Sequence, residues 1–145
     1  MVTISLCMIV RNEEAVLERC LHSVCNVVDE IILVDTGSED RTKEIARSYT
    51  DRIYDFAWSD DFAAARNFSF SKATMDYCMW MDADDVLLEA DTKALLELKE
   101  TLDPSVQVVM LPYHIAFDAQ GKPTFYYYRE PLIRNGQGMR WEGAV

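Results

Sequence analysis

The feature that most constrains the fold is an apolar run at residues 77–81 that ends abruptly in Asp82, Asp84 and Asp85. No charged side chain interrupts the run, whereas three carboxylates fall within the next four positions. This pattern predicts a buried strand of a parallel sheet, followed by an acidic loop at its carboxyl end. In open α/β sheets, ligands bind at that end of the strands.

Neighbouring carboxylates repel one another, so the acidic loop is costly unless water or a cation neutralises it. A solvated acidic turn is the ordinary explanation of an isolated Asp-x-Asp pattern. The buried strand before the loop favours a metal site instead. Because every ligand would be an oxygen, the expected ion is Mg²⁺ or Mn²⁺, which is well suited to holding a diphosphate.

Size and charge restrict the class of protein. A chain of 145 residues predicts one domain, and 14 basic against 25 acidic residues give a net charge of −11. That charge argues against a nucleic-acid partner and against docking to anionic lipid. No stretch is apolar enough to span a bilayer, and no signal peptide is visible. The four cysteines lie in apolar segments, which indicates reduced thiols and a cytoplasmic protein, with peripheral membrane attachment left open for the full-length chain.

Two more buried strands are expected, at residues 4–10 and 30–34, and each runs into polar residues. Asn12 is expected to cap a helix that ends near residue 24, and Ser38 to cap the following helix. Gly37 permits a tight turn after Asp35. Alternating strands and helices predict a βαβ layout, which places the polar strand ends at one rim.

The rest of the chain has weaker signals. The elements expected there are a strand at 52–58, helices at 63–73 and 91–102, the second capped by Asp91, and strands at 106–117, 124–128, 132–135 and 139–145. Arg66 is either a solvated helix charge or a cation that faces a diphosphate. Tyrosines 126–128 are either a platform for a sugar ring or one face of a half-exposed sheet. Because the chain stops inside an apparent strand, a fragment of a longer protein is expected.

Four linked motifs resemble those of family 2 glycosyltransferases, in that family's order. They are SLCMIVRNEE at 5–14, EIILVDTGSEDRT at 30–42, DFAAARN at 61–67 and WMDADD at 80–85. The resemblance implies the GT-A fold, a Rossmann-like α/β three-layer sandwich with a mostly parallel central sheet. It also implies a single domain, with a nucleotide-sugar-binding half at 1–90 and an acceptor-side half at 91–145 that is incomplete. The WEGAV ending at 141–145 is similar to a subgroup whose members continue with His-Glu.

The resemblance also implies a donor site, expected to take a UDP-sugar. The resemblance implies that the base and ribose contact Ile9, Arg11, Asn12 and Glu13, and that the uracil or ribose also contacts Asp35. Gly37 and Ser38 would shape the turn after Asp35. Arg66 would face the diphosphate. Asp82 and Asp84 match the Asp-x-Asp motif, with Asp84 the expected direct ligand of Mn²⁺ or Mg²⁺ and Asp85 assisting. One departure is Arg11, which stands where many members have Tyr, so a guanidinium contact would replace a stacking contact.

The implied reaction is metal-dependent, inverting transfer of a sugar to an acceptor glycan, lipid or protein. Such a reaction needs a carboxylate base, and Glu142 is the one carboxylate in the last predicted strand. A solvated strand residue explains Glu142 equally well, and the base could lie beyond Val145.

Two alternatives stay open. The first is a non-catalytic nucleotide-sugar-binding or interaction domain of the same fold, or an inactive fragment. The second, a nucleotidyltransferase, is disfavoured because RNEE at 11–14 is not a Gly-rich basic loop. The sequence does not decide the oligomeric state.

Overall fold

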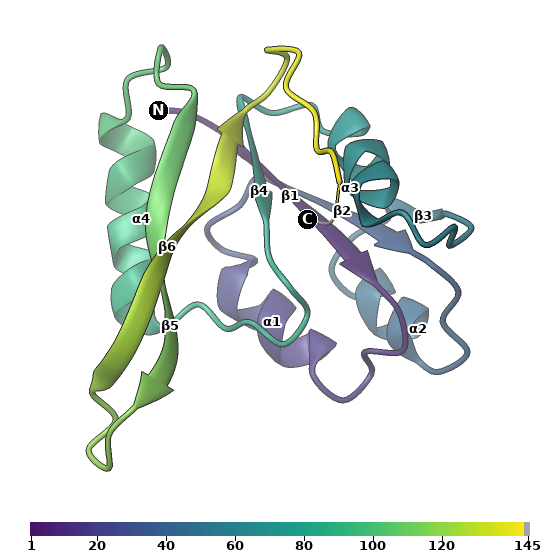
Figure 1. The fold of residues 1–145 in the computed structure, drawn as a ribbon, viewed down its shortest axis with the longest axis horizontal. Helices are drawn as coiled ribbons and strands as arrows, with labels where there is room; N and C mark the ends of the chain where they lie inside the picture. The colour runs from purple at the N-terminus through teal and green to yellow at the C-terminus, as the bar shows by residue number, and fades with distance from the viewer. Residues whose placement is uncertain (144–145) are drawn as a thin grey trace.

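The computed structural model describes residues 1–143, apart from the side chains of Ile115, Pro123 and Tyr127. Helices and strands alternate along most of the chain, which ends in a long hairpin (Figure 1). In chain order the elements are β1 (Ile4–Val10), α1 (Leu17–Val24), β2 (Glu30–Asp35), α2 (Thr42–Arg47), β3 (Ile53–Asp55), α3 (Phe62–Ser71), β4 (Tyr77–Trp80), α4 (Glu89–Thr101), β5 (Val108–Phe117) and β6 (Pro123–Arg134). Within the described residues, no helix has the length and apolar character needed to cross a bilayer.

The strands form one sheet in the order β3-β2-β1-β4-β6-β5. The four strands from β3 to β4 are parallel, whereas β6 pairs antiparallel with both β4 and β5. Val10 pairs with Asp35, and Trp80, the last residue of β4, pairs with Cys7. The carboxyl ends of β1, β2 and β4 therefore meet at one edge of the sheet, as the sequence predicted.

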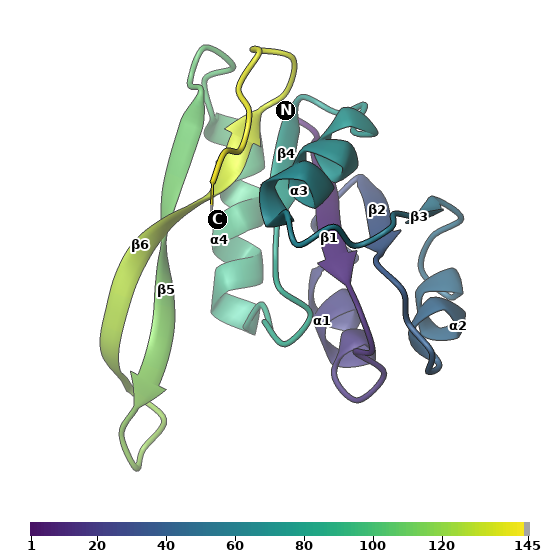
Figure 2. The ribbon, with the colours of Figure 1, turned by 45° about the vertical axis from the view of Figure 1, so that its right-hand side comes forward.

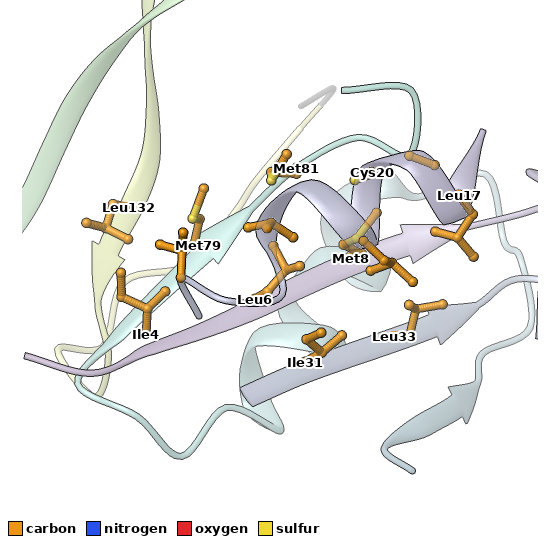
Figure 3. Close-up of a cluster of buried hydrophobic side chains, with 14 of the residues drawn as sticks. Ile4, Leu6, Met8, Leu17, Cys20, Ile31, Leu33, Met79, Met81 and Leu132 are labelled. Atoms are coloured by element: carbon orange, nitrogen blue, oxygen red, sulfur yellow. The ribbon is translucent and has the colours of Figure 1, made fainter. Parts of the chain in front are cut away.

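Helices cover both faces of this sheet, which is why β1, β2 and β4 are almost continuously apolar. Figure 2 shows α3 on one face and α1 and α4 on the other. On the α1 side, Leu6 and Met8 of β1 pack with Leu17 and Cys20 (Figure 3). The α3 side holds a smaller cluster of Cys7, Ile32 and Cys78. All four cysteines are free thiols; Cys7, Cys20 and Cys78 are buried, and Cys25 is half-buried.

Polar side chains bind the opposite edge of the sheet, where the strands begin. The Glu30 carboxylate accepts hydrogen bonds from the Ser5 hydroxyl and from the Thr74 amide, and it pairs with Arg52. The buried Lys99 ammonium lies 2.8 Å from the Asp29 carboxylate, which also accepts the amide of Ile4. These contacts connect β1, β2 and α4 away from the strand ends that carry Asp35 and Asp82.

Several predicted boundaries were wrong. The first helix begins at Leu17 rather than after Asn12, and the second begins at Thr42 rather than after Ser38. Asn12 and Ser38 bond to each other's loops, so neither side chain is available to cap a helix. Helix α4 begins at Glu89, two residues before Asp91. Strand β3 has only three residues, and residues 139–143 form no strand.

The final hairpin is longer than predicted. Strand β6 unites the two strands expected at 124–128 and 132–135. Val109 pairs with Leu132 but Leu111 pairs with Arg129, so the register shifts across Pro131. Such a bulge accommodates a proline, which has no amide proton for the ladder, and the strand can therefore continue through it.

Candidate nucleotide-sugar and metal site

Two loops at the carboxyl edge are tied together by hydrogen bonds. The Asn12 amide donates to the Ser38 hydroxyl at 2.9 Å, and the Asn12 side-chain oxygen accepts from the Glu39 amide at 2.8 Å. Asn12 has a φ of +51°, a left-handed conformation that Asn tolerates better than most residues. These contacts fix the loop after β1 against the loop after β2.

Further contacts extend this connection in both directions. The Glu13 amide donates to the Thr42 hydroxyl at 2.8 Å, and the Glu14 amide donates to the Asp40 carboxylate at 3.2 Å. In return, the Arg41 amide donates to the Glu14 carboxylate at 3.1 Å. These contacts join the two loops into one rim at the carboxyl edge of the sheet.

Asp35 lies at the centre of this rim and is 2% exposed. One carboxylate oxygen accepts the amides of Gly37 and Ser38, at 2.9 and 2.8 Å. Gly37 has a φ of +119°, which favours glycine over any residue with a side chain. The other oxygen, Oδ2, has no hydrogen-bond partner among the described residues. Because an unsatisfied buried acceptor is costly, Oδ2 is suited to a donor group of a ligand.

A pocket of about 290 Å³ lies beside this rim, and we call it the Arg11 pocket. Its lining consists of Ile9, Val10, Arg11, Glu13, Thr36, Trp58 and Phe62. Three residues expected to surround the base and ribose therefore share one pocket. Asn12 is not in its lining, because its side chain is used between the loops.

The acidic loop after β4 gathers its carboxylates as expected. Ligand oxygens of Asp82, Asp84 and Asp85 all lie within 4.8 Å of one another. The Asp82 amide donates to Asp85 Oδ2 at 3.0 Å, and the Tyr113 hydroxyl donates to Asp85 Oδ1 at 2.5 Å. Burial, followed by the charge of Asp85, raises the pKa of Asp82. Three oxygen ligands with mutual repulsion fit a hard divalent cation.

A second pocket, the Arg66 pocket, has a volume of about 420 Å³. Its lining consists of Phe62, Arg66, Trp80, Asp82, Arg129, Glu130 and Trp141. Phe62 lines both pockets, so the two adjoin at the start of α3. Glu13, which lines the Arg11 pocket, has a raised pKa. The larger cause is burial, and the next is the negative charge of Asp84. The base-side loop and the acidic cluster are therefore electrostatically coupled.

Arg66 is 7% exposed and faces the Arg66 pocket from α3. The helix begins behind Asp61, whose side chain accepts the Ala64 amide. The Arg66 guanidinium carbon lies 4.3 Å from the centroid of Trp80 and 4.7 Å from that of Trp141. Burial lowers the pKa of Arg66. Among the described residues its guanidinium makes no hydrogen bond or ion pair, so its donors remain available to an anion.

Three residues that sequence reasoning missed complete this region. Trp141 folds back over the pocket because Asn67 holds both its amide and its carbonyl, at 2.8 and 2.9 Å. Arg129 lies over the rings of Trp80 and Tyr113, at 4.0 and 4.3 Å. The one local sign of the Trp141 contact in the sequence is Asn67, the amide residue that directly follows Arg66. Nothing local in the sequence signalled Tyr113 or Arg129.

Other expected residues lie outside the pockets. Glu142 is exposed, next to Trp141. Tyr126 and Tyr128 are also exposed, with ring centroids 6.0 Å apart, and the Tyr127 side chain lies outside the described part of the chain. None of these three described side chains lines either pocket.

A mostly parallel α/β sheet with a carboxylate cluster at its carboxyl edge is the arrangement expected of the GT-A fold. The family model described as glycosyl transferase family 2 matches residues 5–143. The chain belongs to this family.

Two curated relatives are longer than this chain. The chain is 47% identical to a TPR repeat-containing protein of Synechococcus elongatus, over 98% of this chain and 34% of that protein. It is 30% identical to the lipopolysaccharide core biosynthesis glycosyltransferase LpsC of Rhizobium meliloti, over 88% of this chain and 49% of that protein. The chain therefore spans between a third and a half of the length of these relatives.

Solved structures share the fold. Glucosyl-3-phosphoglycerate synthase from Mycobacterium tuberculosis, in complex with uridine diphosphate, has a TM-score of 0.63 at 23% identity, covering 79% of this chain and 46% of that one. S. aureus TarS 1-349 has a TM-score of 0.57 at 20% identity, covering 80% of this chain and 36% of that one. These likenesses support the GT-A fold expected from the sequence.

Proposed function

We propose that this domain binds a nucleotide-sugar, with a UDP-sugar as the expected donor, and transfers the sugar with inversion in a reaction that depends on Mn²⁺ or Mg²⁺. The observation that carries the proposal is one sheet edge with three elements. They are the open acceptor of Asp35, the buried unpaired Arg66 and the carboxylate cluster of Asp82, Asp84 and Asp85.

The residues take separate roles in this proposal. Asp35 Oδ2 accepts a donor group of the base or ribose, beside the Arg11 pocket. Arg66 binds a phosphate oxygen with donors that the protein itself leaves unpaired. Asp84, which is exposed, and Asp82 hold the metal. When bound, the ion supplies charge stabilisation for the departing nucleoside diphosphate.

One solved relative supports the choice of donor and ion. The structure of glucosyl-3-phosphoglycerate synthase in complex with Mn²⁺ and UDP-glucose has a TM-score of 0.51 at 26% identity, and covers 57% of this chain and 33% of that one. The matched chain binds a hard ion together with a uridine nucleotide, which is the pairing that the acidic cluster and Arg66 suit here. The acceptor and the oligomeric state stay open. The candidate for the carboxylate that takes the proton from the acceptor hydroxyl is Glu142, which directly follows Trp141 in the sequence.

A thermal-shift titration with UDP tests the proposal. UDP should raise the melting temperature only when Mn²⁺ or Mg²⁺ is present, because ligand bound to the native state stabilises it. Asp84→Asn should abolish the metal-dependent part, whereas Asp51→Asn, an exposed carboxylate in the loop before β3, should not. If no nucleoside diphosphate shifts the wild-type melting temperature under any of these conditions, the proposal fails.

The alternative is a domain that binds the donor but does not turn it over. It is favoured by the part-length match to every relative described above. An assay of UDP-glucose hydrolysis in the presence of Mn²⁺, which measures the UDP released, distinguishes turnover of the donor from binding alone. Binding without hydrolysis in this chain, together with hydrolysis by a longer chain, would support the alternative for the domain alone.

A further inference from the structure

Among the described residues, Arg129 is the cation that forms an ion pair with a carboxylate of the acidic cluster, whereas Arg19 donates to the backbone carbonyl of Asp84. Arg129 lies on β6, and its Nη2 is 3.5 Å from Oδ2 of Asp82. Charge-assisted hydrogen bonds of this kind usually measure about 2.7–2.9 Å, so the pair is loose. The guanidinium is held mainly by the rings of Trp80 and Tyr113. Arg129 can therefore change its anionic partner while the rings keep it in the Arg66 pocket.

Arg129 and Arg66 share a pocket but differ in their pairing. Arg66 is buried, and its guanidinium forms no ion pair with any described residue. Arg129, whose side chain is 20% exposed, is paired with a carboxylate that a metal would need. The Arg129 charge therefore offsets part of the repulsion among Asp82, Asp84 and Asp85 in the free protein.

A divalent ion at the cluster would change this balance. It would take Asp82 as a ligand and repel the guanidinium close by. Released from Asp82, the guanidinium would face a pocket that a diphosphate enters, with new anionic oxygens as partners. Arg129 would therefore weaken binding of the metal alone and strengthen binding of the metal together with the nucleotide.

We propose that Arg129 is an exchangeable counter-ion that makes binding of the metal and of the nucleotide diphosphate interdependent. It pairs with Asp82 in the free protein and with the diphosphate in the complex. This inference rests on the proposed function. Since coupling is reciprocal, each ligand should bind more tightly in the presence of the other, and Arg129 should supply part of that coupling.

Arg129→Met tests the exchange, because Met keeps an apolar stem over Trp80 and Tyr113 but has no charge. Mn²⁺ alone should bind about tenfold more tightly than to the wild type, whereas UDP in saturating Mn²⁺ should bind about tenfold more weakly. Free Mn²⁺ is followed by its electron paramagnetic resonance signal, and UDP by isothermal titration calorimetry. Neither readout requires turnover.

Two further variants keep the test interpretable. Lys122→Met removes the same charge from the exposed turn of the same hairpin and should change neither affinity. Arg129→Lys keeps the charge and should keep the penalty on Mn²⁺ alone, and it also serves as a check if Arg129→Met does not fold.

The outcomes separate this inference from the proposed function. If wild-type protein binds UDP with Mn²⁺ but Arg129→Met leaves the affinity for Mn²⁺ unchanged or weakened, the counter-ion role is overturned and the proposed function stands. If Arg129→Lys binds free Mn²⁺ as tightly as Arg129→Met, charge is not the cause and the inference also fails. If wild-type protein binds no nucleotide, both are overturned.

Discussion

Asn67 holds Trp141 by both polar groups of its backbone, with the side-chain amide donating to the carbonyl at 2.9 Å and the side-chain oxygen accepting the amide at 2.8 Å. The two residues are 74 positions apart. Asn67 follows Arg66 on α3, so one helix both supplies the buried cation and fixes the aromatic ring above it. The chain after β6 is therefore part of the pocket wall.

Asn67→Ala should release that wall. Loss of two hydrogen bonds should make local opening of residues 135–143 easier by about 1–2 kcal/mol, with little effect on global unfolding. Hydrogen exchange followed by mass spectrometry measures this directly. Ser71→Ala removes a hydroxyl that bonds only within the same helix and is the control. Equal exchange in both variants would show that the Asn67 contact does not hold the segment.

Arg66→Met should weaken binding of UDP in the presence of Mn²⁺ by about 30-fold, the equivalent of about 2 kcal/mol. The thermal stability of the free protein should not fall, because burial of this guanidinium disfavours its charged form and lowers its pKa. Calorimetric titration and thermal melting measure the two effects. Lys72→Met is the matched control, since that ammonium lies 5.1 Å from the ring of Tyr54, outside both pockets.

Asn12 should be replaceable by Gly at a lower cost than by Ala. Both changes remove the hydrogen bond to the Glu39 amide, worth about 1 kcal/mol, but only Ala adds the strain of a left-handed backbone, about 1 kcal/mol more. We expect a loss of about 1 kcal/mol for Asn12→Gly and about 2 kcal/mol for Asn12→Ala in urea unfolding. Similar losses for the two variants would contradict the strain argument.

Glu30→Gln should reduce stability in a pH-dependent way. Although burial opposes it, hydrogen bonds from Ser5 and Thr74, with the charge of Arg52, lower the pKa of Glu30 below its usual 4.5. A lowered pKa stabilises the fold above the unfolded-state value, and that stabilisation is lost as the pH falls through the folded-state value. The variant should therefore be about 2 kcal/mol less stable at pH 7 and approach the wild type below pH 4.5.

Denaturant unfolding at several pH values checks the Glu30 prediction. Glu97→Gln, on the exposed face of α4, is the control and should stay close to the wild type throughout. A difference between Glu30→Gln and the wild type that does not shrink in acid would show that shape, rather than charge, sets the cost of the substitution.

The sequence predicted the parallel part of the sheet and its functional edge because those signals are local. Nearly continuous apolar runs identified β1, β2 and β4, and the residues after each run identified the rim. Cap positions could not be read in the same way. Asn12 and Ser38 are good caps in isolation, but the Ser38 hydroxyl accepts the Asn12 amide, 26 positions away, and the Asn12 side chain accepts the Glu39 amide, 27 positions away.

The contacts that the hairpin makes with the acidic cluster could not be predicted from the sequence, for a different reason. Tyr113 and Arg129 reach the acidic cluster only because the bulged hairpin turns that pair of strands toward the loop after β4. Two strands were expected here, at 124–128 and 132–135, whereas the register shift around Pro131 lets β6 continue through both. A side chain's direction on a bulged strand depends on its partner strand, which local periodicity does not report.

The salt-bridged base of the sheet, where Glu30 and Lys99 lie, has one more consequence. The contacts that stabilise the fold lie where the strands begin, and the candidate site lies where the same strands end. Pocket-lining side chains that no other loop of the described chain holds, such as Arg11, can be exchanged while Glu30 and Lys99 keep the strands together at the other end. A sheet built in this way can change what its carboxyl edge binds while the contacts at its amino end keep the fold.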